Sequence, residues 1–458
     1  MAWAEQAARS LVETFEGSFD AAGVAVAAAA VDRADAVNCR SGAPADGRFE
    51  IGSVTKTMSA TLLALLAADG TLNLDDEVGR WLRAGPNGAI TLRQLATHTS
   101  GLPAVAPNFR PADPDNYWAS FTAELAEEGL RQSALTPGRR YSNFGYQLLG
   151  LVLERAAGQD YAALVAGRLL APLSMASSGV GRAGGGTPLP GHAGGRVIRH
   201  WDRPLPGAGG VESTIDDLAR YARACLSPPP TALGAALTAA QVPQVPIGAG
   251  RAQALGWIVI DDRLRGHNGG TGGFSSCVIV DPGAGTGVAI LVSSRGYGEA
   301  LAQAARLALA GDNPHRARPQ PLGPEWEERA RAVADALLDG RAADVHAAAT
   351  AKFRGRIGPE EFGRAWGSRT REAGTAGDVS VTCRRQYGLV TADVTIGFAR
   401  RPVAVRIGFL QSGEIAGFRF LPARPGGGVP SAHRRPEPRP TEEQASGNQA
   451  AEDQPVED

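Results

Sequence analysis

The sequence predicts a mixed α/β (α+β) protein, with an antiparallel sheet flanked by helices in a large first domain and a small α+β domain after it. Three strand-like runs near the middle of the chain are separated by turn residues, which is typical of an antiparallel meander. A helical run from Ser53 to Ala68 is apolar on nearly every side, which indicates burial inside a domain. The composition changes after Gly311, where a proline-rich stretch begins. These features together predict two folded domains of unequal size.

The composition is that of an ordinary globular protein. The chain has 458 residues, of which 43% are hydrophobic and 20% charged, and its net charge is −1. Without a basic stripe, this balance argues against nucleic acid and anionic membranes as partners. The four cysteines are scattered and have no histidine at metal-ligand spacing, so we expect free thiols and no metal. No run has the length of a secretory or membrane-spanning segment, which predicts a cytoplasmic protein if Met1 is the true start.

The first elements lead to a serine at the head of a helix. The runs from Val24 to Val31 and from Ala36 to Arg40 predict a first hairpin, and Phe49 leads into the buried helix. We expect Gly70 to end this helix, because glycine adopts the left-handed conformation common at helix C-termini. A nucleophile on the first turn of such a helix is held rigidly, beside backbone N–H groups that are free to bind negative charge.

A second helix and the meander follow. Tyr141-Ser142-Asn143 precedes a periodic helix from Phe144 to Ala157, which Gly158 closes. The meander strands are predicted at Ala254 to Ile260, Phe274 to Val280 and Gly287 to Val292, with turns at Asp261-Asp262 and Asp281-Pro282-Gly283. Between the first two strands lies the run from His267 to Gly273, whose glycines let a strand edge approach a ligand closely.

The predicted domain boundaries follow from composition. Residues 1–312 form the first domain, 313–323 a proline-rich linker, 324–423 the small α+β domain and 424–458 a disordered tail. In the small domain, helices near 326–337, 342–353 and 359–371 precede strands at 379–387, 389–398, 403–410 and 415–421. This order of elements resembles the nuclear-transport-factor-type cone fold, which can hold a small ligand or form dimers.

Ser53 and Lys56 are spaced as a nucleophile and its base. Residues three apart on a helix share a face, so the Ser53 hydroxyl is expected beside the Lys56 amine. An amine kept neutral by burial or by a nearby cation can remove the hydroxyl proton. Lys56 is one of only two lysines in the chain, the other being Lys352. The alternative interpretation is a chance tetrapeptide in which Ser53 only caps the helix.

Three motifs carry chemistry in chain order: Ser53-x-x-Lys56, Tyr141-x-Asn143 and His267-x-Gly269. This order resembles the serine β-lactamase and penicillin-binding-protein superfamily, in its class C, esterase and D-aminopeptidase-like branch. The resemblance extends over about residues 23–308. It includes these segments: Phe49 to Lys56, Leu72 to Asp76, Leu95 to Leu102, Tyr141 to Asn143 and His267 to Phe274. It implies a β-lactamase-like fold with an all-helical subdomain beside the sheet.

The resemblance also implies a role for each residue. Ser53 would attack a carbonyl to form an acyl-enzyme, which water then releases, while Lys56 and Tyr141 share the proton transfer. Asn143 would hydrogen-bond the amide or acyl oxygen of the substrate. The backbone N–H groups of Ser53 and Gly270 would form the oxyanion hole. No metal or organic cofactor is implied.

Each side chain also has a purely structural interpretation. Tyr141 alone would more often be a core tyrosine, and Asn143 alone a helix cap. The order of the motifs favours the catalytic interpretation for both, whereas for His267 a structural and a binding role stay open. His98 lies in a segment similar to a scaffold loop of the superfamily, so we expect no catalytic role for it.

The third motif departs from the pattern of classical β-lactamases. His267 and Asn268 stand where those enzymes, by this resemblance, carry lysine and threonine, which help bind the carboxylate beside a β-lactam ring. Histidine is mostly neutral at pH 7 and reaches less far, so the anion site is weakened. A histidine there is similar to what esterase and D-amino-acid peptidase members carry.

We therefore expect a serine hydrolase that cleaves a carboxylic ester, or an amide or D-amino-acid peptide, through an acyl-serine. One alternative is a β-lactamase or D-Ala-D-Ala carboxypeptidase, and another is a non-catalytic receptor or scaffold for a peptidoglycan fragment. The expected partner is a small ester, amide or peptide substrate. Its identity and the oligomeric state stay open, because the pocket walls are expected from the loops Pro103 to Trp118 and Ser178 to Pro206, which have no recognisable chemistry.

Overall fold

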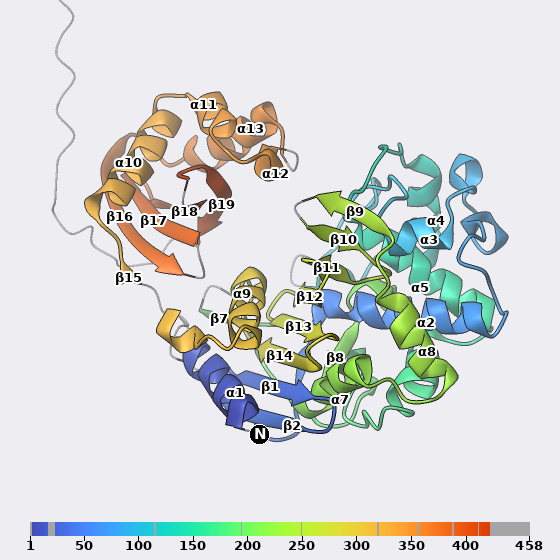
Figure 1. Ribbon diagram of the computed structural model, residues 1–458. Helices are drawn as coiled ribbons and strands as arrows, with labels where there is room; N and C mark the ends of the chain where they lie inside the picture. The colour runs from blue at the N-terminus through green and yellow to red at the C-terminus, as the bar shows by residue number, and fades with distance from the viewer. Residues whose placement is uncertain are drawn as a thin grey trace, which may run out of the picture. The chain divides into compact units, whose positions relative to one another are not determined.

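The structure is a computed structural model of the chain (Figure 1). It describes residues 2–16, 23–113, 116–193, 195–248, 250–317, 320–354, 357–386, 389–410 and 412–421. Two compact units divide the chain, residues 1–318 and residues 319–458. The tail expected at 424–458 lies outside the described residues. Within the described ranges, no helix has both the length and the apolar character needed to cross a membrane.

An antiparallel sheet of eight strands forms the centre of the first unit, in the order β2-β1-β14-β13-β12-β11-β10-β9. Its strands are β1 (Val26–Asp32), β2 (Ala36–Ser41), β9 (Val245–Gly248), β10 (Arg251–Gln253), β11 (Ile258–Ile260), β12 (Leu264–Gly270), β13 (Ser275–Asp281) and β14 (Thr286–Val292). Every neighbouring pair is antiparallel, so the predicted hairpin and meander are confirmed. The three strands β1, β13 and β14 are almost wholly buried, which requires helices on both faces.

Three helices cover this sheet. On one face, α1 (Ala2–Phe15) and α9 (Gly298–Leu309) pack against each other and against the strands, and α7 (Ile215–Leu226) packs on the other (Figure 1). The indole of Trp3 on α1 donates a hydrogen bond to the carbonyl of Ala308 on α9, 3.1 Å away. The helix α1 was not predicted from the sequence.

The remaining helices form a second layer around α2 (Thr55–Ala68), which contacts α5, α6 and α8. They are α3 (Leu92–Ala96), α4 (Ala123–Gln132), α5 (Asn143–Ala157), α6 (Tyr161–Val165) and α8 (Ala232–Ala240). Every residue of α2 from Thr55 to Leu66 is buried, as its apolar sequence predicts. Gly158 ends α5 in the left-handed conformation, φ 61°, as expected. Enclosure on all sides fixes the N-terminus of α2 in place.

Short elements join these layers. The strands β3 (Gly47–Glu50), β4 (Gly179–Val180), β5 (Thr187–Pro188) and β8 (Val211–Ser213) form a small sheet in the order β4-β8-β3-β5, and β6 (Gly191–Ala193) pairs with β7 (Arg196–Ile198). Single turns are η1 (Gly52–Val54), η2 (Val78–Arg80), η3 (Gly85–Asn87), η4 (Ala166–Leu170), η5 (Gly181–Ala183), η6 (Pro206–Ala208) and η7 (Pro314–Ala317). The turn η1 directly precedes α2 and carries Ser53.

One predicted strand is shorter than expected. The run from Ala254 to Ile260 is extended only in β11, from Ile258. Gly256 has φ +72°, and a Cβ atom there would lie 2.5 Å from the carbonyl oxygen of Lys56. The chain therefore bends against α2 before it enters the sheet. The turn at Asp261-Asp262 is present, and both residues have positive φ, as in a tight hairpin.

The second unit has its own sheet and core. Its helices are α10 (Pro324–Leu338), α11 (Ala342–Ala347), α12 (Ala351–Arg354) and α13 (Pro359–Thr370). Its strands are β15 (Gln320–Pro321), β16 (Ala376–Gln386), β17 (Leu389–Phe398), β18 (Val403–Phe409) and β19 (Ile415–Leu421), antiparallel in chain order. Alternate residues of β18 are buried, and α10 packs on β16 and β17. The single helix expected at 342–353 is wrong, because Ala349 pairs with Ile415 and interrupts it.

Candidate active site

The turn that carries Ser53 is pressed against the edge of β12. Gly52 has φ +49°, and a Cβ atom there would lie 2.7 Å from the backbone nitrogen of Gly270. A Cβ atom on Gly269 would lie 2.1 Å from the carbonyl oxygen of Ile51, which also accepts a hydrogen bond from the Ser276 hydroxyl at 2.7 Å. Only glycine fits at these two positions, so the glycine-rich strand and the serine turn meet backbone to backbone.

Lys56 lies one helical turn beyond Ser53 and is fully buried. Its Nζ is 2.9 Å from the Ser53 Oγ, 2.9 Å from the Asn143 Oδ1 and 2.6 Å from the carbonyl oxygen of Ala208. The last two atoms only accept hydrogen bonds. A neutral amine has two N–H groups and one lone pair, so it satisfies both acceptors and directs the lone pair at the Ser53 hydroxyl.

The surroundings favour that neutral amine. Burial lowers the pKa of Lys56 well below its usual value, and the positive charge of Arg203 lowers it further. With its Oδ1 held by Lys56, Asn143 keeps its Nδ2 group as a donor for a substrate oxygen.

Tyr141 also contacts Ser53. Its hydroxyl donates to the Ser53 Oγ at 2.9 Å, while 36% of the residue's surface is exposed. The ring is therefore at the mouth of the site and the hydroxyl is inside. Burial of the hydroxyl raises the pKa of Tyr141 to about 12, although the hydrogen bond to Ser53 opposes the shift. At neutral pH the phenol keeps its proton and can donate it.

His98 holds the Tyr141 motif in place. Its Nδ1 accepts a hydrogen bond from the backbone N–H of Ser142 at 3.1 Å, and its ring centroid is 4.5 Å from that of Tyr141. Burial lowers the pKa of His98 well below its usual value. Ser142, and not Asn143, caps α5, because its Oγ accepts from the Gly145 N–H at 2.8 Å. The sequence did not reveal this support for Tyr141.

His267 lies on β12 near Tyr141, with the two ring centroids 6.3 Å apart. Its Nδ1 is 2.6 Å from the carbonyl oxygen of Asn268, to which it donates. Burial lowers the pKa of His267 to about 3. The ring is therefore neutral at pH 7 and offers no positive charge to a substrate carboxylate.

A pocket opens beside Ser53. It is lined by Gly52, Ser53, Trp118, Asn143, Gln147, Trp201, Arg203, Leu205, Ala208, Gly209, Gly270 and Thr271. Sequence reasoning placed the walls in the loops that contain Trp118, Trp201 and Arg203, but it did not single these residues out. The one tryptophan in each of these two loops, Trp118 and Trp201, was the available signal for the pocket walls.

Five charged side chains form an ion-pair network that reaches this pocket through Arg203. Glu50 on β3 and Glu212 on β8 are register partners, and His200, Arg48 and Arg203 surround them. The Arg48 Nε is 2.8 Å from Glu212, and the Arg203 Nη2 is 2.9 Å from Glu50. Like charges opposite each other on neighbouring strands repel, so the three basic residues are needed to stabilise Glu50 and Glu212 in this position.

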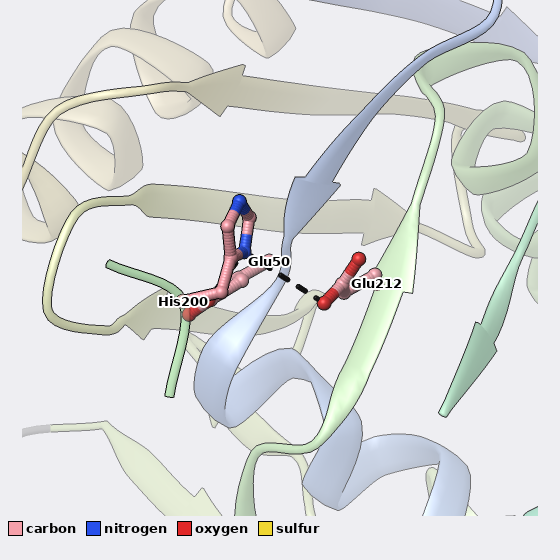
Figure 2. A group of neighbouring side chains, drawn as sticks. All are labelled: Glu50, His200 and Glu212. Atoms are coloured by element: carbon pink, nitrogen blue, oxygen red, sulfur yellow. Dashed lines mark hydrogen bonds and ion pairs between the residues drawn. The ribbon is translucent and has the colours of Figure 1, made fainter. Parts of the chain in front are cut away.

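Figure 2 shows Glu50, His200 and Glu212 converging, with possible metal-ligand atoms within 4.8 Å of one another. The His200 Nδ1 faces a Glu50 oxygen at 2.9 Å, and its Nε2 faces the carbonyl oxygen of Leu189 at 2.9 Å. Both partners only accept, so both ring nitrogens donate and the ring is cationic. The hydrogen bond to Glu50 raises the pKa of His200, which favours this form. A metal ligand needs a free nitrogen lone pair, so these donors fit an ion-pair network and not a metal.

The structure thus brings Ser53, Lys56, Tyr141 and Asn143 into direct contact and sets Gly270 against the serine turn. His267 lies beside Tyr141 but no hydrogen bond joins it to Ser53 among the contacts of the described residues. The arrangement places a neutral amine and a protonated phenol around the hydroxyl oxygen of Ser53. It has the parts that nucleophilic catalysis at a carbonyl requires.

Comparison with known proteins points to one family. A family model described as Beta-lactamase matches residues 8–312. Penicillin-binding protein 4* of Bacillus subtilis (strain 168) is 35% identical over 133 residues, which are 28% of this chain and 29% of that protein. Protein flp of Staphylococcus aureus (strain N315) is 26% identical over 271 residues, 54% of this chain and 53% of that protein. The chain thus matches about half or less of the length of these curated relatives.

A solved structure has the same fold. The crystal structure of D-alanine carboxypeptidase AmpC from Burkholderia cenocepacia superposes with a TM-score of 0.56 and 24% identity. The match covers 67% of this chain and 98% of that one. At this identity the likeness concerns the fold alone, and the β-lactamase-like fold expected for the first unit is confirmed.

Proposed function

Because this chain belongs to the Beta-lactamase family, whose model matches residues 8–312, we propose that it is a serine hydrolase with Ser53 as nucleophile. One observation carries the proposal: the Ser53 Oγ lies 2.9 Å from both the Lys56 Nζ and the Tyr141 hydroxyl. The substrate class we propose is a carboxylic ester, or an amide or D-amino-acid peptide. The small domain would be of the nuclear-transport-factor-like type.

In the first step, Ser53 forms a bond to the substrate carbonyl carbon, and its proton passes to the lone pair of Lys56. The carbonyl oxygen takes up negative charge, and the backbone N–H groups of Ser53 and Gly270 are the proposed donors to it. The bond to the leaving group then breaks. The leaving oxygen or nitrogen takes a proton from the Tyr141 hydroxyl, and Lys56 returns its proton to the phenolate.

In the second step, water attacks the acyl-serine. The same two residues act again, since one must accept the proton of the water and the other must return one to the Ser53 oxygen. Lys56 suits the role of base because burial keeps it neutral, and Tyr141 suits that of acid because its phenol is protonated.

The ester assignment rests on His267. Its neutral ring offers no charge for the carboxylate of a β-lactam or a peptide C-terminus. β-Lactam hydrolysis or D-Ala-D-Ala carboxypeptidase activity is the second candidate, favoured by the family and by the likeness to penicillin-binding protein 4*. A receptor that binds without reacting is the third, and the contact of the Ser53 Oγ with the buried Lys56 amine argues against it.

The test is hydrolysis of a 4-nitrophenyl ester by the wild type and by Ser53→Ala. We expect no turnover by Ser53→Ala above the uncatalysed rate, and labelling of the wild type by a fluorophosphonate probe. Ser227→Ala, on an exposed serine at the end of α7, is the matched control and should behave as the wild type. An active Ser53→Ala protein would refute the mechanism. Turnover of nitrocefin in place of esters would support the second candidate, and absence of labelling with a folded domain the third.

A further inference from the structure

The pocket beside Ser53 is on the acyl side of the site. Neither Tyr141 nor His267 is among the described residues that line it, whereas Ser53, Asn143 and Gly270 are. The leaving group takes its proton from Tyr141, so it departs on the side of Tyr141. The acyl group that stays on Ser53 therefore occupies the pocket, a step that rests on the proposed function.

The walls of this pocket combine aromatic surface with one cation. Trp118 and Trp201 supply apolar surface, and the guanidinium carbon of Arg203 is 5.5 Å from the ring centroid of Trp201. Only 12% of the Arg203 side chain is exposed. Its Nη2 donates to Glu50 at 2.9 Å, and no other described residue accepts a hydrogen bond from the guanidinium. An arginine has five N–H donors, so several remain for a ligand in the pocket.

The ion pair behind the pocket holds Arg203 in this position. Burial alone would raise the pKa of Glu50, but the hydrogen bond from His200 and the charge of Arg203 outweigh it and lower the pKa to about 2. Glu50 is therefore charged at any pH used for assay. It fixes one edge of the guanidinium and leaves the other toward the pocket.

The charges around the pocket do not cancel. Arg48, His200 and Arg203 are positive when His200 donates through both ring nitrogens, and Glu50 and Glu212 are negative. The group carries a surplus of one positive charge. A buried positive charge that lacks a counter-charge is destabilising, because it has lost its hydration. The surplus therefore favours binding of an anion.

We propose that the acyl group of the substrate carries a carboxylate at its far end, bound by Arg203, with its carbon chain between the two tryptophans. The substrate class is then a monoester or monoamide of a short dicarboxylic acid. Arg203 is the residue that selects it, because a planar guanidinium binds a carboxylate through two parallel hydrogen bonds.

The experiment compares esters of equal chain length that differ in the terminal carboxylate. Mono-(4-nitrophenyl) succinate, glutarate and adipate are assayed beside 4-nitrophenyl butyrate, pentanoate and hexanoate. We expect kcat/KM for the best monoester to exceed that of its neutral counterpart by about 10-fold or more, the range of a charge-assisted hydrogen bond. Ser53→Ala supplies the background, which matters because these monoesters also hydrolyse through attack by their own carboxylate.

Arg203→Gln should reduce this ratio to near 1, mainly through a higher KM for the monoester. The ratio is the measured quantity, because loss of Arg203 also affects Lys56 and thus the rate with every ester. Arg203→Lys keeps a charge for Glu50 and should retain part of the preference. Arg168→Gln, on an exposed pair with Asp69, is the matched control and should keep the full ratio. A wild-type ratio near 1, or a ratio that Arg203→Gln leaves unchanged, would overturn the proposal.

A binding measurement separates this inference from the hydrolase proposal. Ser53→Ala protein is titrated calorimetrically with N-phenylglutaramic acid and with N-phenylpentanamide, which differ only at the terminal carboxylate. Tighter binding of the acid, lost in Ser53→Ala/Arg203→Gln, supports the pocket assignment even if no ester is hydrolysed. Equal binding of both compounds overturns it even if Ser53 proves to be an active nucleophile.

Discussion

At the scale of single residues, the chemistry depends on which atoms around the Ser53 Oγ carry protons. Lys56 satisfies two acceptors with two N–H groups, and Tyr141 donates its own proton to the same oxygen. The roles of base and acid then follow from a lowered and a raised pKa. These roles predict how substitutions of Lys56 and Tyr141 change the rate of hydrolysis.

Lys56→Arg should lower kcat/KM for a 4-nitrophenyl ester by about 10³-fold or more, within the range for loss of a general base. Arginine keeps the N–H donors but stays charged, because it does not lose its proton in the assay range. Steady-state kinetics at pH 7 to 9 check this. A variant within 10-fold of the wild type would show that Lys56 is not the base.

Tyr141→Phe should lower kcat by about 100-fold or more while the melting temperature stays nearly unchanged. The phenylalanine ring keeps the contact with His98. Because 36% of Tyr141 is exposed, loss of its hydroxyl should change the free energy of unfolding little. Because the pKa of Tyr141 is about 12, the wild-type rate should show no decline from this group below about pH 10. Retained activity in Tyr141→Phe would assign the acid to another group.

At the scale of elements, the site depends on the close approach of the turn η1 to β12. The sequence predicted the buried helix, the glycine-rich strand and their order in the chain. Local sequence patterns could not predict the close packing of Gly52 on Gly270, because the two glycines lie 218 positions apart, and only the resemblance implied that Ser53 and Gly270 are neighbours. For the same reason the sequence predicted which loops form the pocket walls but did not identify Arg203, because its partner Glu50 is 153 positions away.

Gly52→Ala should destabilise the protein by roughly 1–3 kcal/mol and abolish most activity, because the new methyl group meets the Gly270 backbone 2.7 Å away. Gly70→Ala is the matched control, since Gly70 also has positive φ but no atom within 4 Å of the added carbon. It should cost stability without loss of kcat. Urea unfolding and ester hydrolysis measure both effects, and equal behaviour of the two variants would contradict the account.

At the scale of the whole molecule, the ion-pair network joins β3, β8 and the segment after β7 behind the site. The motifs predicted the catalytic cluster because the serine and lysine are only three positions apart in the chain. The network escaped prediction because its members are ordinary charged residues from two distant parts of the chain, 48–50 and 200–212. Whether the small domain is of the nuclear-transport-factor type stays a prediction.

His200 makes the stability of the molecule depend on pH. Its pKa in the folded state is raised by Glu50, so its contribution to stability is fully present below its unfolded pKa of about 6.5 and is lost as the pH rises through the folded value. The free energy of unfolding should therefore decrease over that interval, and less so in His200→Gln. Urea titrations between pH 5 and 9 test this. A decline of equal size in both proteins would assign it to other groups.

The most direct test of the central claim is the rate at which a fluorophosphonate labels Ser53 as a function of pH, followed by intact-protein mass spectrometry with peptide mapping. We predict one label on Ser53, a rate that rises with an apparent pKa well below 10.5, and no such dependence in Lys56→Arg. Labelling at another residue, or an unchanged pH profile in Lys56→Arg, would contradict activation of Ser53 by a neutral Lys56.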